Sequence, residues 1–265
     1  MVPLLIGPFA PPEPLEHRDT RVFSVLSANL FFRNTEPVAL IEQIDRLQPD
    51  LICLQECAPE TRLFLTGELG SSYPYSLHDA SHSWAGSGVV AFSRTPLLPF
   101  SGEPYRGVGG HRWLEFEVEV AGTRLRVANA HFYAPLSLRS VRQQDLMSAH
   151  AATWLSTSYG ARPMLIAGDL NSNEHGLPVR RLLRSGFRSV HTERGRGIGA
   201  TWPRTGVLRH LPGTRLDHVL YRGEGLRLIE QGVGEDFGSD HRPVWARFEV
   251  ISDRCCSPSH SSAIT

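Results

Sequence analysis

The sequence predicts an α/β fold with a mixed sheet, and three kinds of pattern lead to this prediction. Short, wholly apolar runs of the kind found in buried strands occur at Leu51–Leu54 and Met164–Ala167. Apolar residues recur at helical spacing across residues 35–47. Trp113–Val120 and Thr123–Ala130 flank an Ala-Gly turn, as the strands of a hairpin do. The chain therefore reads as two α/β halves, without an internal repeat or a linker that divides it.

The other elements follow from the same patterns. Arg21–Ala28 alternates and is rich in β-formers, so it predicts the first strand. Gly195–Pro212 is rich in Gly, Pro and Arg and predicts a long loop. Further strands are expected at Gly86–Phe92, Leu97–Phe100, Leu216–Tyr221, Leu226–Gln231 and Val244–Val250. Further helices are expected at Pro59–Leu69, Leu138–Leu155 and Leu177–Leu183.

We expect one domain at residues 21–250, between a flexible leader at 1–20 and a disordered tail at 251–265. The apolar, proline-rich Met1–Pro14 lacks the basic leader of a signal peptide. It is also too short for a membrane span, which needs about 20 apolar residues. The alternative is the stub of a membrane or export segment. A cytoplasmic and an exported location both stay open.

Charge and cysteine content narrow the function classes. Lys+Arg and Asp+Glu number 27 each, so the net charge is zero at pH 7. This argues against a strongly basic protein that coats nucleic acid, although a local basic groove would still permit a nuclease. The four cysteines form no Cys-x-x-Cys pair or His/Cys cluster that would predict zinc.

Acidic, amide and imidazole side chains follow several of the apolar runs. Strands that end at one edge of a sheet bring such side chains together, and the resulting mixture suits a hard cation and a phosphate group. Asp169 and Asn171 are the strongest local signal, because positions i and i+2 of an extended chain face the same way. The alternative for this pair is an ordinary turn. The segments are Ser27-Ala28-Asn29, Leu54-Gln55-Glu56, Gly168-Asp169-Leu170-Asn171, Leu216-Asp217-His218 and Gly238-Ser239-Asp240-His241.

The order and wording of these segments resemble the endonuclease/exonuclease/phosphatase superfamily, the deoxyribonuclease-I-like metal-dependent phosphoesterases. The resemblance runs from about Arg21 to about Val250. It implies a four-layer α/β/β/α sandwich in which two mixed, mostly antiparallel sheets pack face to face. It also implies a hydrolase that uses Mg²⁺, with Mn²⁺ as the alternative ion. Gly197–Pro203 is similar to a bacterial branch of the superfamily with varied or unassigned substrates.

The resemblance places three residues at the metal ion. Glu56 is implied as the main Mg²⁺ ligand, Asn29 as a residue that supports the metal and the phosphate, and Asp240 as a carboxylate directed toward the metal. Without the family pattern, a Glu after a strand would be a solvated surface residue. An Asn at a strand end would be a turn cap.

The resemblance also implies the catalytic residues. Asp169 positions or deprotonates the attacking water, and Asn171 hydrogen-bonds the phosphoryl oxygens. Asp217 pairs with His241, which then acts as general base or binds the transition-state oxyanion. His131 contacts a phosphoryl or leaving-group oxygen, with a satisfied core histidine as the alternative.

Substrate recognition is less constrained by the sequence. Tyr133 shares a face with His131, while Arg112 and Arg142 belong to arginine-bearing segments that suit a phosphate group or are solvated surface. We expect a phosphodiester substrate, either nucleic acid or a lipid head group, and a monomer without an obligate protein partner. The alternatives are a phosphomonoesterase of a small metabolite, a catalytically silent binding module, and a site recruited for non-hydrolytic chemistry. His218 faces away from Asp217 and is expected to be structural.

Overall fold

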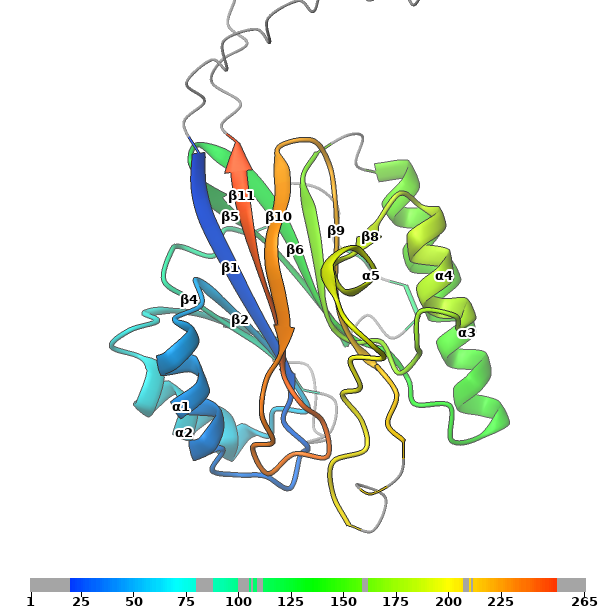
Figure 1. Cartoon of the computed structure of the whole chain (residues 1–265), viewed down its shortest axis with the longest axis horizontal. Helices are drawn as coiled ribbons and strands as arrows, with labels where there is room; N and C mark the ends of the chain where they lie inside the picture. Colours follow the sequence, from blue (N-terminus) through cyan, green and yellow to red (C-terminus); the bar gives the residue numbers. More distant parts are fainter. Residues whose placement is uncertain are drawn as a thin grey trace, which may run out of the picture.

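Two β-sheets, with helices on their outer faces, make up the described part of the chain (Figure 1). The structure is a computed structural model, and it describes residues 20–79, 88–99, 105, 107–108, 112–158, 162–206, 210 and 212–251. The leader and tail expected from the sequence therefore lie almost entirely outside the described residues. None of the helices in the described ranges has the length and apolar character needed to cross a membrane.

The first sheet has six strands in the order β10-β11-β1-β2-β4-β3. β1 and β2 pair in parallel, whereas the other neighbouring strands pair antiparallel. Helix α1 (Val38–Leu47) connects the parallel pair, and helix α2 (Pro59–Leu69) follows β2. The strands are β1 Thr20–Asn29, β2 Leu51–Gln55, β3 Tyr75–His78, β4 Val89–Ser93, β10 Leu226–Val233 and β11 Val244–Ile251.

The second sheet has five strands in the order β5-β6-β7-β9-β8. β6 and β7 pair in parallel and are connected by helix α3 (Leu138–Ser158), so this sheet repeats the arrangement of the first. Helices α4 (Leu177–Arg184) and α5 (Val190–Arg194) follow β7. The strands are β5 Trp113–Val120, β6 Thr123–His131, β7 Met164–Asp169, β8 Arg188–Ser189 and β9 Asp217–Arg222.

The two parallel pairs determine where the polar strand ends meet. Parallel neighbours have their carboxyl ends at the same edge of a sheet. Asn29 is therefore in register with Gln55 in the first sheet, and His131 with Asp169 in the second. The antiparallel strand β9 starts opposite Asp169, at Asp217. Four of the five segments singled out in the sequence thus lie where strands end or begin, and Gly238–His241 lies in the loop that connects β10 to β11.

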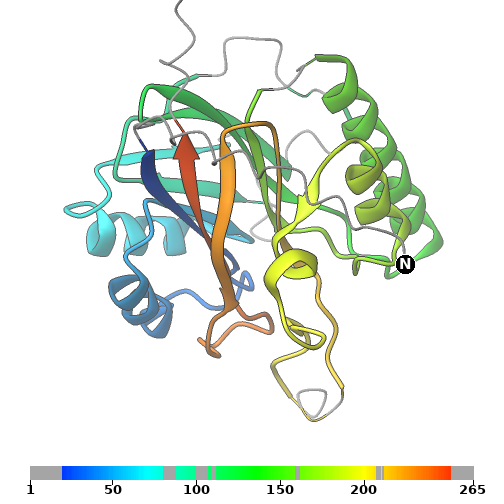
Figure 2. The ribbon, with the colours of Figure 1, turned by 45° about the horizontal axis from the view of Figure 1, so that its top comes forward.

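Three apolar clusters establish the order of the layers. One lies between the sheets and joins residues such as Phe23 of β1 and Phe116 of β5. A second cluster packs α1 and α2 on the first sheet and includes Ile44 of α1 and Ile52 of β2. A third packs α3 and α4 on the second sheet and includes Met147. Helices thus cover both outer faces (Figure 2), and the predicted four-layer α/β/β/α sandwich is confirmed.

The longer elements match their predictions, and the differences have local causes. Helix α1 begins at Val38 rather than at residue 35, because Pro37 disfavours a helical backbone at Glu36 and itself takes the N-cap position. The strand predicted at Leu97–Phe100 is wrong over its described residues, where Leu98 forms only an isolated bridge with Glu117. Strands β3 and β8 and helix α5 were not predicted, because segments of 4, 2 and 5 residues carry too little periodicity.

Candidate active site

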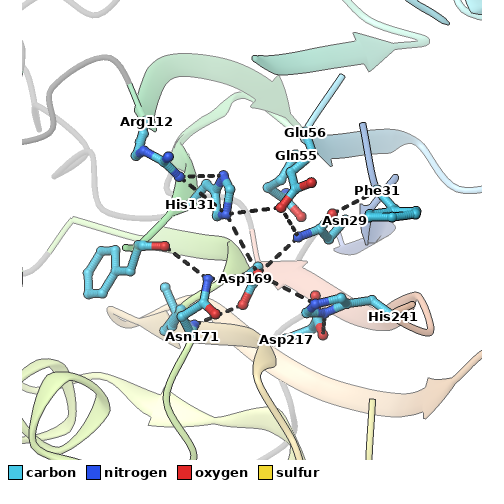
Figure 3. Close-up of polar contacts among 12 residues, drawn as sticks. Asn29, Phe31, Gln55, Glu56, Arg112, His131, Asp169, Asn171, Asp217 and His241 are labelled. Atoms are coloured by element: carbon cyan, nitrogen blue, oxygen red, sulfur yellow. Dashed lines mark hydrogen bonds and ion pairs between the residues drawn. The ribbon is translucent and has the colours of Figure 1, made fainter. Parts of the chain in front are cut away.

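The predicted polar residues converge at the edge where β1, β2, β6 and β7 end (Figure 3). Asn29, at the end of β1, bonds to a carboxylate from each sheet. Its Nδ2 donates to Glu56 Oε1 at 3.2 Å and to Asp169 Oδ2 at 3.0 Å. Its Oδ1 accepts from the backbone N–H of Phe31 at 2.9 Å, which fixes the orientation of the amide. Asn29 therefore links the two sheets across the site.

Glu56 follows β2 in the left-handed backbone region, with φ of 52°. Its Oε2 accepts from the backbone N–H of Phe32 at 3.2 Å. Burial raises the pKa of Glu56 and the charge of Asp240 adds to the increase, whereas hydrogen bonds from Asn29 and Phe32 and the charge of His241 lower it. Burial outweighs these opposing effects, so the pKa of the carboxyl stays above its ordinary value.

Asp169 and Asn171 meet through a turn, so the argument from an extended chain is wrong. β7 ends at Asp169, and Asn171 has a left-handed φ of 47°. In that conformation Asn171 donates to Asp169 twice, from its N–H to Oδ1 at 2.8 Å and from Nδ2 to Oδ2 at 3.0 Å. Asn171 Nδ2 also donates to the carbonyl of Phe132 at 3.0 Å. The turn and the polar site are the same feature.

Gly168 is required by the close approach of β6 and β7. Its φ is +154°, and a Cβ at this position would lie 1.8 Å from the carbonyl oxygen of Ala130. No side chain fits at that distance, so the glycine lets Asp169 lie directly beside His131.

Asp217 and His241 form a buried pair. Asp217 Oδ2 lies 2.8 Å from His241 Nδ1, and the two residues are 0% and 5% exposed. Because an ionised carboxylate only accepts hydrogen bonds, Nδ1 carries the proton and Nε2 faces the site. His241 Nε2 lies 3.9 Å from Asp169 Oδ2. The pairing implied by the family resemblance is therefore present in the geometry.

Burial and neighbouring charge shift the pKa values of this group in opposite senses. Burial raises the pKa of Asp169 to about 7, with Asp217 adding to the increase and His241 opposing it. Burial alone would lower the pKa of His241, but Asp217, Asp169 and Asp240 together raise it to about 10. Near neutral pH the site therefore holds a cationic imidazole beside a carboxyl that gains and loses its proton readily.

His131 lies on the opposite side of Asp169 from His241. Its Nε2 is 3.7 Å from both Asp169 Oδ2 and Glu56 Oε1. Arg112 Nη1 lies 3.0 Å from His131 Nδ1, and the Arg112 guanidinium is 4.7 Å from the centroid of the Tyr133 ring. Arg112 is only 8% exposed, its Nη1 also lies 3.3 Å from His131 Nε2, and its charge interacts with Glu56 and Asp169, so it is a buried cation at the edge of the carboxylate group.

The remaining predicted residues differ in how close they come to this group. Asp240 is half-buried and near enough for its charge to raise the pKa of both Glu56 and His241. Arg142 is exposed on α3, and no contact joins it to the group within the described ranges. The structure therefore brings together every predicted site residue except Arg142.

Sequence reasoning missed the residues that hold the Asp217–His241 pair. Thr201 Oγ1 accepts from the backbone N–H of Asp217 at 3.2 Å. Ser239 Oγ accepts from the His241 N–H at 3.0 Å and donates to the carbonyl of Asn29 at 2.7 Å. Ser239 was visible as part of the Gly238–His241 segment, and Thr201 lies within the Gly197–Pro203 motif, but the sequence assigned neither residue a role in holding the pair.

A second unpredicted feature is a polar link between the sheets beneath the site. Gln55 Nε2 donates to Asn129 Oδ1 at 2.8 Å. Asn129 Nδ2 in turn donates to the carbonyls of Leu54 at 3.1 Å and Val90 at 2.9 Å. Buried amides of this kind hold a specific arrangement because unpaired ones are costly. The link fixes the end of β2, which precedes Glu56, against β6.

His218 contacts Ser172 rather than the polar group at the strand ends, as its strand position predicted. Its Nε2 lies 2.8 Å from the carbonyl of Ser172, and burial lowers its pKa to about 4. The folded protein therefore resists protonation that the unfolded chain accepts below its ordinary pKa of 6.5. The contribution of neutral His218 to the free energy of unfolding is therefore complete above pH 6.5 and is lost as the pH falls toward 4.

We expect His218→Gln to weaken this acid sensitivity. One pKa unit corresponds to about 1.4 kcal/mol, so His218 accounts for a loss of roughly 3 kcal/mol between these pH values. Urea unfolding at pH 7 and pH 4.5 measures the difference, with the exposed His175→Gln as control. An unchanged pH dependence in His218→Gln would show that another group is responsible.

The donor set suits a divalent cation. Asp169, Asp217 and His241 offer ligand atoms within 4.8 Å of one another, and Glu56 and Asp240 add carboxylates nearby. Asp217 Oδ1 is buried and has no hydrogen-bond partner among the residues that the structure describes. Carboxylate oxygens are the ligands that hard cations prefer, and a cation would offset the crowding of negative charge.

Solved structures of low sequence identity share this fold. An endonuclease/exonuclease/phosphatase from Beutenbergia cavernae has a TM-score of 0.65 and 19% identity, covering 88% of this chain and 72% of its own. An AP endonuclease from Archaeoglobus fulgidus has a TM-score of 0.65 and 17% identity, covering 85% of this chain and 99% of its own. TDP2 from D. rerio, complexed with a single-strand DNA product, has a TM-score of 0.65 and 15% identity, covering 86% and 98%.

Sequence comparison is more decisive about the family. No curated protein sequence matches the chain. The sequence profile of the Endonuclease/Exonuclease/phosphatase family, however, matches residues 26–241, which span the strand ends from β1 to His241. Members of this family are phosphoester hydrolases that depend on a divalent metal, and the buried acidic group described above suits such an ion. The chain therefore belongs to the Endonuclease/Exonuclease/phosphatase family and is a metal-dependent phosphoesterase.

Proposed function

We propose that the protein is a Mg²⁺-dependent phosphodiesterase. The observation that carries the proposal is the charge of the site: the carboxyls of Glu56, Asp169, Asp217 and Asp240 lie around two imidazoles. A phosphomonoester carries more negative charge near neutral pH than a diester does. An acidic site therefore favours the diester, because repulsion between like charges weakens the binding of the more negative monoester.

The side chains divide the work of hydrolysis between them. Asp169 orients a water molecule and accepts its proton as the water oxygen bonds to phosphorus and the bond to the leaving oxygen breaks. Its pKa of about 7 suits a proton acceptor near neutral pH. His131 and cationic His241 face the site from opposite sides of Asp169, where they donate hydrogen bonds to phosphoryl oxygens. The Asn171 side chain amide donates to Asp169 Oδ2 and so keeps the carboxyl in position beside the phosphoryl group.

We propose that Glu56 and Asp240 hold the metal ion and that Asn29 orients Glu56. Glu56 Oε1 accepts from the Asn29 side chain and Oε2 from the Phe32 backbone N–H, and burial raises the pKa of Glu56, so a cation would favour its ionised form. Asp217 is a weaker candidate, because its Oδ2 already accepts from His241. When bound, Mg²⁺ polarises the phosphoryl oxygen and offsets developing negative charge.

We expect Glu56→Gln to reduce Mg²⁺ affinity by at least roughly 10- to 100-fold, the range seen when even indirect metal contacts are removed. Calorimetric titration of the protein with Mg²⁺ and Mn²⁺ measures the affinity without any substrate. Glu60→Gln, on the exposed face of α2, is the matched control. Normal Mg²⁺ binding by Glu56→Gln, together with weakened binding by Asp217→Asn, would move the ion to Asp169, Asp217 and His241.

Hydrolysis of bis-p-nitrophenyl phosphate and p-nitrophenyl phosphate, each with Mg²⁺ and with EDTA, tests the proposed function. We expect Mg²⁺-dependent cleavage of the diester and much slower release from the monoester. A preference for the monoester would refute the phosphodiesterase proposal in favour of a phosphomonoesterase. Assays with plasmid DNA, single-stranded RNA and a phosphoinositide then identify the class of natural diester.

A further inference from the structure

Two leucines near the active site are almost completely exposed. Leu136 and Leu138 are 89% and 91% exposed, the highest values among the large apolar side chains of the described residues. They follow Tyr133 on the segment that leaves the end of β6 and enters α3. Val141, in the next turn of α3, is 44% exposed. An exposed apolar surface beside a functional site commonly marks a site of contact with a membrane, a ligand or another protein.

This exposure belongs to an ordered conformation. Ser137 precedes α3, and its Oγ accepts from the N–H of Ser140 at 3.1 Å while Ser140 Oγ accepts from the N–H of Ser137 at 2.9 Å. This reciprocal pairing is a helix-capping arrangement. The Leu136 N–H also donates to the carbonyl of Ala134 at 2.8 Å. Local hydrogen bonds therefore hold both leucines outward.

The chain segment that carries the leucines has arginines and no acidic side chain. The sequence has no acidic residue between Glu119 and Asp145, and Arg139 and Arg142 are exposed beside the leucines. The first turn of α3 contains no acidic side chain, although helix starts favour acidic residues and disfavour arginine. A partner that carries negative charge would compensate for this arrangement.

We propose that Leu136, Leu138, Val141, Arg139 and Arg142 form a docking surface for a lipid bilayer that contains anionic head groups. Protruding leucines flanked by arginines suit insertion at the boundary between head groups and acyl chains. Leu136 follows His131 by five positions in the chain, so docking would hold the polar site close to the membrane. The inference rests on the proposed phosphodiesterase in naming its substrate as a lipid with a phosphodiester head group.

Vesicle flotation of the full chain tests the proposal. We expect binding to vesicles of phosphatidylcholine with phosphatidylglycerol, and a loss of about tenfold or more in affinity for Leu136→Ser/Leu138→Ser, because both side chains lose their burial in lipid. Leu63→Ser, at an exposed leucine on α2, is the control and should bind normally. Arg139→Gln/Arg142→Gln should lose the preference for phosphatidylglycerol. Thermal unfolding of each variant establishes that it is folded.

Several outcomes would overturn the proposal. It fails if the unaltered protein ignores both kinds of vesicle, or if the double leucine variant binds as well as Leu63→Ser does. The apolar Met1–Pro14 is present in every variant, so its own contribution cancels in this comparison. Binding is measured with EDTA and without turnover. Failure to cleave bis-p-nitrophenyl phosphate would therefore refute the proposed function alone, and failure to bind vesicles would refute the docking surface alone.

Discussion

Asp169→Asn is expected to reduce kcat for bis-p-nitrophenyl phosphate by roughly 10²- to 10⁴-fold, the usual contribution of a positioned acid–base group. The substitution keeps the size and shape of the side chain, although its NH2 group replaces an oxygen that accepts from Asn29 or Asn171. It removes the proton acceptor, because an amide cannot take a proton from water near neutral pH. Folding and Mg²⁺ binding through Glu56 should be largely retained.

The pH dependence provides a second readout for Asp169. The base must be ionised to act, so the rate should rise with pH around the Asp169 pKa of about 7, and a bound cation should move this rise to lower pH. The residual activity of Asp169→Asn should lack the rise. Asp145→Asn, on α3 and paired with Arg181, is a matched control that should keep full activity. An Asp169→Asn protein with ordinary kcat would exclude Asp169 as the base.

His241→Gln and Asp217→Asn are each expected to lower kcat by about 10³- to 10⁴-fold, and the double variant little further. The two residues act as one unit, since Asp217 Oδ2 holds His241 Nδ1 at 2.8 Å and keeps the imidazole charged. Additive losses in the double variant would show that they act separately.

The raised pKa of His241 favours one of the two roles that the family resemblance leaves open. With a pKa of about 10, His241 is cationic near neutral pH and donates to a phosphoryl oxygen instead of accepting a proton. The rate should therefore fall as the pH rises through the His241 pKa. Asp217→Asn removes the main charge that raises this pKa, so the fall should move to lower pH. A rate that instead increases as His241 loses its proton would make it the base.

The sequence by itself predicted the class of fold and most of the site, because both depend on local patterns. The wholly apolar run at Leu51–Leu54 predicted a buried strand, and the spacing of apolar residues across 35–47 predicted the helix that the structure places at Val38–Leu47. Polar residues that directly follow such strands had to lie at sheet edges. Asn29, Glu56, Asp169 and the other residues of the cluster were therefore predictable as one group.

Tertiary structure alone decided how these residues meet. Three features depend on contacts between segments far apart in the chain: the left-handed turn at Asn171, the burial of Arg112 against His131, and the link between Gln55 and Asn129. The pKa values of Asp169 and His241 depend on the same contacts, because desolvation and charge act through distance in space. The sequence determined which side chains reach the edge, and the packing of one sheet on the other determined their partners, charge and exposure.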